Sequence, residues 1–270
     1  MVLTFHENIN TLIDLVNTDM VFYNHWLLHN RLTVNAKKSN FILYKGYGQS
    51  INCKLKKIKL GKEEITQTHT YKYLGLLLDS RLTFEPHVKK LSKDIRYRLN
   101  MLFKFRPSIT ENTAAQIYKV MILPLIDYAD IVYSTGNKDN LKRLKILQNK
   151  ALRIIGKLRK RTNTDELAKK LEITELKKRR LMHMLQYAHK TSKKQNEIKH
   201  IRKITRYNNG KYILKTLSVN SDTYARSFDY KSRVHWNSLP KFVHEMRDKK
   251  SFNKHIKSNL DTIYNKLCKE

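Results

Sequence analysis

The feature that most constrains the fold is the stretch from Pro86 to Lys190, in which apolar residues recur every three or four positions. This spacing places apolar side chains on one face of a helix and therefore predicts successive amphipathic α-helices. The first begins at Pro86, whose missing N–H has no helical partner at that position. The others are expected over residues 110–133, 141–158 and 174–190. Pro124 either kinks the second helix or divides it in two. Helices joined by such short loops predict a small bundle.

The residues on either side of this stretch show mixed patterns. Apolar positions from Ile9 to Leu27 recur at helical spacing and predict a helix over 8–30. Shorter runs, punctuated by glycines, predict strands over residues 40–45, 51–60 and 72–79. After Lys190 the chain is more polar and basic, and a final helix is expected over 251–267. A small apolar cap is expected from Trp236, Leu239, Phe242, Phe252 and Ile256. The predicted fold class is α+β, mainly α.

Composition indicates what kind of partner the chain meets. Lysine and arginine number 55 against 23 aspartate and glutamate, and the formal net charge is +32. A field of this size favours a polyanionic partner, of which nucleic acid is the expected one. A membrane surface is the competing polyanion. No apolar run approaches the ~20 residues that span a bilayer, and we expect no membrane partner.

Cysteine usage and the first residues bear on the compartment. Cys53 and Cys268 lie far apart and lack the spacing of a metal-binding pair, so we expect free thiols in a reducing compartment. The first ten residues lack the basic segment that begins a secretory signal. We therefore expect an intracellular location, in the nucleus or the cytoplasm, and no secretion.

Positive charge is concentrated between Asp139 and Arg206. This segment holds 22 Lys and Arg against 6 Asp and Glu, a difference of +16, which is half of the net charge. A solvated helix face normally mixes both signs, so a face of one sign is better explained by contacts with nucleic-acid phosphates. The run K-K-R-R at 177–180 extends this basic segment. The predicted contact residues are Lys142, Lys145, Lys150, Arg153, Lys157, Arg159, Lys160 and Arg161.

Four segments together resemble a known family. They are W-L-L-H-N-R-L-T-V-N-A-K-K-S-N-F-I-L-Y-K (26–45), Y-K-Y-L-G-L-L-L-D-S-R-L-T-F (71–84), L-P-L-I-D-Y-A-D-I-V-Y (123–133) and H-W-N-S-L-P (235–240). In this order and spacing they resemble the later part of a non-LTR (LINE-like, jockey-type) retrotransposon reverse transcriptase. The resemblance implies a palm remnant over 1–84, built from a helix and short antiparallel strands. It also implies a helical thumb over 85–190 and a basic C-terminal extension over 191–270.

The resemblance assigns roles to two groups of residues. Lys37 and Lys38 fall in the family's motif D, where a lysine near the triphosphate can stabilise developing charge or donate a proton. The alternative is that both are ordinary surface lysines. Tyr73, Leu74 and Gly75 match the strand that grips the primer end, where a glycine lets the backbone approach a sugar–phosphate closely. The alternative there is a buried strand with a glycine bulge.

The family's catalytic aspartates are expected to lie upstream of Met1. Polymerase chemistry needs two metal ions held by adjacent carboxylates on a tight turn. Residues 128–130 spell Y-A-D, but Ile131 stands in place of a second aspartate and the segment is predicted to be helical. Asp127 and Asp130 lie three apart, either as ligands of a metal or phosphate or as a plain surface pair. We therefore expect no catalytic residue, metal site or cofactor in this chain, although the intact family enzyme uses Mg²⁺.

These patterns fit a truncated RNA-directed DNA polymerase that binds template–primer but does not catalyse alone. RNA, DNA and RNA–DNA hybrids are the expected partners, through phosphate contacts that carry no base code. One alternative is a non-enzymatic, basic nucleic-acid-binding protein derived from such an element. Another is a structural helical protein whose charge only keeps it in solution.

Overall fold

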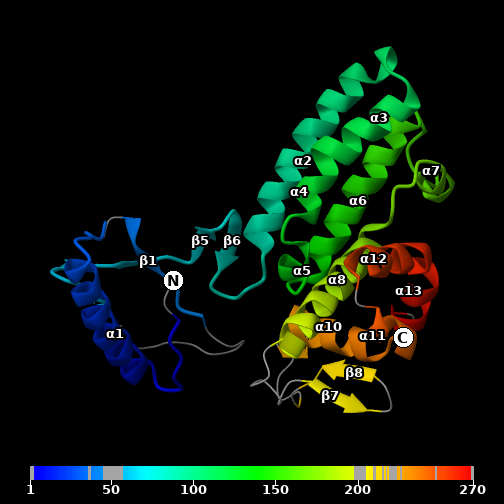
Figure 1. Ribbon diagram of the computed structural model, residues 1–270. Coiled ribbons are helices and arrows are strands. Elements are labelled where there is room, and N and C mark those ends of the chain that lie inside the picture. Colours follow the sequence, from blue (N-terminus) through cyan, green and yellow to red (C-terminus); the bar gives the residue numbers. More distant parts are fainter. Residues whose placement is uncertain are drawn as a thin grey trace. The chain divides into compact units, whose positions relative to one another are not determined.

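The computed structural model describes residues 3–35, 38–44, 57–197, 205–208, 211–214, 216, 218, 224–225, 227–246 and 248–268. Helices predominate and the strands are few and short, so the fold is α+β, mainly α, as predicted (Figure 1). The chain divides into two compact units, Met1–Pro86 and His87–Glu270. Each is described by itself.

The first unit is built on α1, Ile9–His29, which confirms the helix predicted from the apolar spacing. Asn8 begins the helix by accepting hydrogen bonds from two first-turn backbone N–H groups, the nearer at 2.9 Å. α1 buries one stripe and leaves its other faces in solvent, where Phe22 is 70% and Trp26 58% exposed. The core of the unit consists of Ile13, Met20, Ile58 and Leu60.

Three pairs of short strands accompany α1. β1 (Asn40–Phe41) pairs in parallel with β4 (Thr66–Gln67), β2 (Lys59–Leu60) pairs antiparallel with β3 (Glu63–Glu64), and β5 (Thr70–Tyr73) pairs antiparallel with β6 (Leu76–Asp79). The strand predicted over 40–45 is thus two residues long where it is described. Most of the strand predicted over 51–60 lies outside the described residues. The parallel pair was not anticipated from the sequence.

The single strand predicted over 72–79 is wrong, because this segment contains the turn of the β5–β6 hairpin. Tyr73 pairs with Leu76, so Leu74 and Gly75 form a two-residue turn. Both have positive φ, 45° and 85°, which the commonest hairpin turn requires at its two central positions. Gly75 adopts that conformation without the steric penalty of a side chain, and it reverses the chain here.

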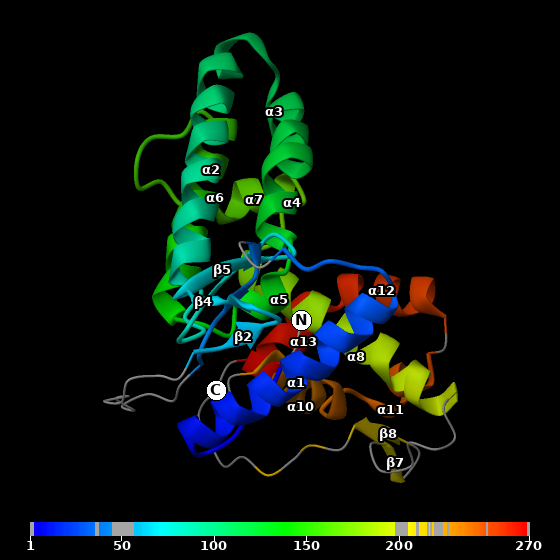
Figure 2. The ribbon, with the colours of Figure 1, turned by 90° about the vertical axis from the view of Figure 1, so that its left-hand side faces the viewer.

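α2, Glu85–Phe105, begins at the boundary of the two units and belongs to the second from His87 onward. The apolar stripe predicted for it is buried and consists of Val88, Leu91, Ile95, Leu99 and Leu102. A 3₁₀ turn at Arg106–Ser108 follows and reverses the chain, and α3 (Glu111–Ile117) returns alongside α2 (Figure 2). Arg106 is buried in this turn and donates hydrogen bonds of 2.7 Å to the carbonyl oxygens of Ile155 and Ile109, so the turn is fixed to the end of a later helix.

The helix predicted over 110–133 is divided. Its pieces are α3 (Glu111–Ile117), a π-helical turn (Tyr118–Ile122), α4 (Leu123–Asp127) and α5 (Asp130–Tyr133). In the π-turn the Leu123 N–H donates to the carbonyl oxygen of Tyr118. Pro124 follows in the first turn of α4, where the N–H that it lacks is not needed. Ala129, with a φ of 55°, separates α4 from α5.

The remaining long helices agree with the apolar spacing. α6 spans Lys138–Ile155 and ends at Gly156, and α8 spans Leu176–Glu197. Between them lies the short α7, Asp165–Lys170. A Cβ at Gly156 would lie 2.5 Å from Leu167 Cδ2, so glycine allows α7 to approach the end of α6 closely.

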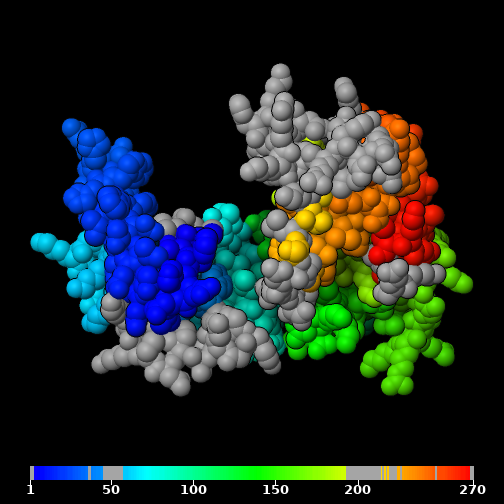
Figure 3. Space-filling view, turned by 90° about the horizontal axis from the view of Figure 1, so that it is seen from below, coloured from blue at the N-terminus to red at the C-terminus, as the bar shows by residue number. Residues whose placement is uncertain are grey.

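The C-terminal part packs against α8. Its elements are β7 (Thr205–Asn208), β8 (Lys211–Leu214), α10 (Phe228–Asn237), α11 (Lys241–Glu245), α12 (Lys249–Ser258) and α13 (Leu260–Cys268). The side chains of α10 to α13, orange to red, form one continuous surface in Figure 3. Their core includes Leu181, Leu185 and Ala188 of α8 together with Trp236, Leu239, Phe252 and Ile256. Two details of the prediction are wrong: Phe242 is 50% exposed, and the final helix is interrupted at Asn259.

Candidate nucleic-acid interface

The predicted contact residues begin on α6, which turns a basic face to solvent. Its buried side is apolar and includes Leu144 and Leu147. Lys142 and Lys150 are exposed and Arg153 is half-buried on the other side. At about 100° per residue these three lie within about 80° of one another around α6, so they share one face of the helix. Phosphates of a polyanion could follow such a face.

Two lysines of this face already have carboxylate neighbours. Lys142 Nζ lies 3.0 Å from Asp139 Oδ1, and Lys145 Nζ lies 2.8 Å from Glu175 Oε1. The hydrogen bond that Lys145 donates to Glu175 raises the pKa of Lys145, against a smaller opposing effect of burial. Exposed pairs of this kind contribute only about 0–1 kcal/mol, so a phosphate can replace the carboxylate at small cost.

The loop after α6 carries the other predicted residues. Lys157, Arg159, Lys160 and Arg161 are all exposed. Lys157 adopts a left-handed backbone conformation, with φ of 52°, directly after the helix. The loop is tied to α6 because Arg153 Nε donates to the carbonyl oxygen of Thr162 at 3.2 Å. Helix and loop therefore present one basic segment, and its role in binding stays a prediction.

The K-K-R-R run does not extend this segment as predicted. Arg180 is buried, and burial lowers its pKa although Tyr133 and Asp130 oppose the effect. Lys178 Nζ lies 2.5 Å from Asp261 Oδ1. Lys177 is the exposed member of the run. Cationic residues on a helix that packs on two sides can bind neighbouring elements of the fold. A count of charges does not distinguish such residues from those that are free to contact a phosphate.

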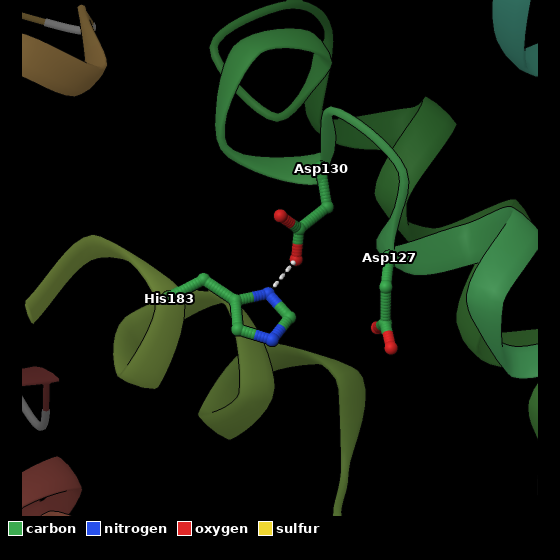
Figure 4. Close-up of side chains that lie close together, drawn as sticks. All are labelled: Asp127, Asp130 and His183. Carbon is green, nitrogen blue, oxygen red and sulfur yellow. Dashed lines mark hydrogen bonds and ion pairs between the residues drawn. The ribbon is translucent and has the colours of Figure 1, made fainter. Parts of the chain in front are cut away.

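Arg179 holds the corner at which α4 meets α5. Its guanidinium makes two hydrogen bonds to the carboxylate of Asp127, one of them 3.0 Å from Nε to Oδ1. One turn further along α8, His183 Nδ1 lies 2.7 Å from Asp130 Oδ2, as Figure 4 shows. Asp130 is 4% exposed. The Y-A-D sequence is thus a helix break at Ala129 that is fastened to α8.

Asp127, Asp130 and His183 also form the one group within the described residues whose geometry could hold a metal ion, with potential ligand atoms within 4.8 Å of one another. The donor set does not fit the metal chemistry of a polymerase. That chemistry needs adjacent carboxylates with open positions for substrate, whereas the carboxylate of Asp127 is already paired with the guanidinium of Arg179. Arg180 adds a second positive charge close to Asp130. We assign the group to joining the α4–α5 corner to α8.

The first unit contains the other predicted site residues. Lys37 lies outside the described residues, and Lys38 is exposed, with its backbone N–H donating to Asn35 Oδ1 at 3.1 Å. Leu74 is 74% exposed at the tip of the β5–β6 hairpin and Tyr73 is 37% exposed beside it. The primer-grip assignment therefore falls on a projecting turn, and it stays a prediction.

Sequence reasoning missed the exposed aromatic residues of α2. Tyr97, Phe103 and Phe105 are 68%, 67% and 58% exposed. The available signal was their position: none of the three belongs to the apolar stripe that the helical spacing assigned to the core, and each has a lysine or arginine next to it in the sequence.

Comparison with known proteins bears out the resemblance to jockey-type elements. The chain is 30% identical over 142 residues to the RNA-directed DNA polymerase from mobile element jockey of Drosophila funebris. This match covers 50% of this chain and 14% of that protein. It is 26% identical over 162 residues to the jockey polymerase of Drosophila melanogaster, covering 57% and 17%. It is 32% identical over 94 residues to the probable RNA-directed DNA polymerase from transposon BS of Drosophila melanogaster, covering 34% and 10%.

The chain is similar to a part of jockey-type reverse transcriptases. The matches span less than a fifth of the length of these jockey and BS polymerases. No protein-family model matches the chain, and no solved structure matches it. Among the described residues, no helix is both long enough and apolar enough to cross a membrane.

Proposed function

We propose that this fragment, derived from a jockey-type reverse transcriptase, binds template–primer nucleic acid through phosphate contacts made by α6 and the loop that follows it. The observation that carries the proposal is the exposed basic segment on a chain whose relatives are RNA-directed DNA polymerases. In this proposal residues 1–84 correspond to the end of the palm, 85–190 to the thumb and 191–270 to a basic extension. Its place of action is intracellular.

Binding, not catalysis, is the proposed activity of these 270 residues. The sequence contains no two adjacent aspartates, and two-metal phosphoryl transfer depends on a clamp of neighbouring carboxylates. We expect no template-dependent extension when the purified chain is given a primed RNA template, Mg²⁺ and deoxynucleotides. Extension that requires both template and primer would contradict this part of the proposal.

The binding proposal is tested by the salt dependence of affinity for one DNA duplex. Each neutralised phosphate adds about −0.9 to the slope of log K against log salt concentration. Replacing Lys142, Lys150, Lys157 and Lys160 by glutamine removes four exposed charges. Lys145 and Arg153 are left in place because they bond to segments outside α6, whereas the partner of Lys142, Asp139, lies in the same helix. We expect the slope to become shallower by about 0.9 for each phosphate that the variant no longer neutralises.

A matched variant separates a binding surface from the general effect of charge. Lys249, Lys250, Lys254 and Lys257 of α12 are also exposed, so changing these four to glutamine alters the net charge equally. We expect this second variant to keep the wild-type slope. Equal slopes in both variants, or a wild type with no salt dependence, would favour the interpretation in which the charge only keeps the protein in solution.

A further inference from the structure

The outer face of α2 combines aromatic rings with positive charge. Tyr97 and Phe103 are 68% and 67% exposed. The buried stripe supplies the packing of this helix, and at about 100° per residue Tyr97 lies opposite that stripe while Phe103 lies at its flank. The outer-face rings thus make no contribution to the core, and a helix of this kind normally has polar residues on its solvent side.

These residues occupy a broad arc of the helix surface. At about 100° per residue, Phe103, Arg96, Lys93, Lys104 and Tyr97 fall within about 120° of one another, with Phe103 at one edge of the arc and Tyr97 at the other. The rise of the helix places Tyr97 and Phe103 about 9 Å apart along its axis. They are therefore two separate platforms with cationic side chains next to each.

The charge on this face points to the chemistry of the partner. Lys89, Lys90, Lys93, Arg96 and Lys104 are exposed, while Asp94 is the one acidic residue between 86 and 105. An apolar protein surface would leave these cations without partners. A single nucleic-acid strand offers phosphates for the cations and bases for the rings, because every base can stack on an aromatic side chain.

We propose that the outer face of α2 binds single-stranded nucleic acid, with bases stacked on Tyr97 and Phe103 and phosphates held by Lys93, Arg96 and Lys104. This rests on the proposed function, since it adds a single-stranded segment to the nucleic acid bound by α6. A paired duplex cannot use the rings in this way, because its bases are already stacked on one another. The face is thus distinct from α6 in what it recognises.

The test is a variant that removes the rings and keeps every charge. Leucine at both positions, Tyr97→Leu with Phe103→Leu, retains apolar side chains of good helix propensity on an exposed surface, so the fold is preserved. Stacking contributes about 1–3 kcal/mol per base, so we expect affinity for an oligo(dT) strand to fall about 10-fold or more. Affinity and salt slope for a DNA duplex are expected to stay at the wild-type values.

The outcomes separate this inference from the proposed function. Unchanged oligo(dT) affinity in the leucine variant would overturn the inference while leaving duplex binding by α6 standing. An equal loss for oligo(dT) and duplex would also overturn it, because the face would then not select single strands. Concentration-dependent self-association of the wild type that the leucine variant abolishes, with oligo(dT) affinity unchanged, would identify a protein interface instead. A wild type that binds neither probe would refute both proposals.

Discussion

Asn237 and Leu214 exchange two hydrogen bonds, one in each direction. Asn237 Oδ1 accepts from the Leu214 backbone N–H and Asn237 Nδ2 donates to the Leu214 carbonyl oxygen, each at 2.9 Å. Residues paired in an antiparallel sheet exchange hydrogen bonds in the same way. The side chain at the end of α10 thus takes the place of a third strand beside β8, which gives the asparagine of H-W-N-S-L-P a structural role.

This pairing predicts that Asn237→Asp destabilises the second unit. The carboxylate cannot donate to the Leu214 carbonyl oxygen and places a charge beside it, and a polar group left unsatisfied costs about 1–3 kcal/mol. We expect a lower urea midpoint than for the wild type, followed by circular dichroism. Asn265→Asp on the exposed side of α13 is the matched control, and an equal shift in both variants would contradict the role of the pair.

Arg179 is predicted to act on stability and not on nucleic-acid binding. Arg179→Met leaves the carboxylate of Asp127 without its partner, and the two side chains are 20% and 22% exposed. We expect a loss of about 1–3 kcal/mol, between the values typical of exposed and buried pairs. Lys177→Met, at an exposed position of the same run, should leave the unfolding free energy near the wild-type value. Should Lys177→Met prove the more destabilising change, the assignment of the corner contact is wrong.

Stability of the second unit is predicted to fall on acidification. Burial lowers the pKa of His87, with the charge of Lys90 adding to the effect, and burial likewise lowers the pKa of His235. Between these lowered values and the ordinary value of about 6.5, the unfolded chain binds more protons than the folded one. The stability that depends on these histidines being neutral is therefore fully present above about pH 6.5, and it is lost as the pH falls below that value.

The histidine contribution is measured as a difference, because acidification also raises the charge of a chain that is already strongly basic. Urea midpoints of the wild type and of His87→Gln are compared at about pH 7.5 and about pH 5.5. We expect the wild type to lose more stability than the variant over this interval. Parallel losses would show that His87 is not responsible.

Limited proteolysis should remove the first unit before the second. Where it is described, its core cluster has four buried members, its strands are two to four residues long, and α1 exposes Phe22 and Trp26. Segments with few buried contacts open locally at low free-energy cost. We expect a resistant fragment that begins after Pro86. A resistant fragment from the first unit, with the second digested, would contradict this.

The sequence predicted the elements whose pattern is local and repeated. α1, α2 and α6 follow from apolar residues at helical spacing, because one buried face is enough to determine each. It did not predict the β5–β6 hairpin, since Leu74–Gly75 is embedded in a run of strand-forming residues and the pairing of Tyr73 with Leu76 decides where the chain turns. Short pieces such as α4 and α5 depend on Ala129, whose left-handed conformation has no clear sequence signal.

The candidate site was predictable only in part for a related reason. The number of lysines and arginines gives the sign of the surface charge, but tertiary contacts decide which group each cation is paired with. Arg179 and Lys178 are engaged by Asp127 and Asp261, which lie far away in the sequence, while Lys150 is exposed. Tyr97 and Phe103 were overlooked because the helical spacing picks out the buried stripe and gives no role to aromatic residues outside it.

α8 belongs to two groups of contacts at once. Arg179 and His183 hold the α4–α5 corner, while Leu181, Leu185 and Ala188 lie in the core with Trp236. A helix shared in this way links the free energies of the two groups, because neither can lose α8 without releasing the other. We infer that residues 87–268 unfold in one cooperative transition. Shortening the chain at the end of α8 would therefore weaken the helical bundle along with the part removed.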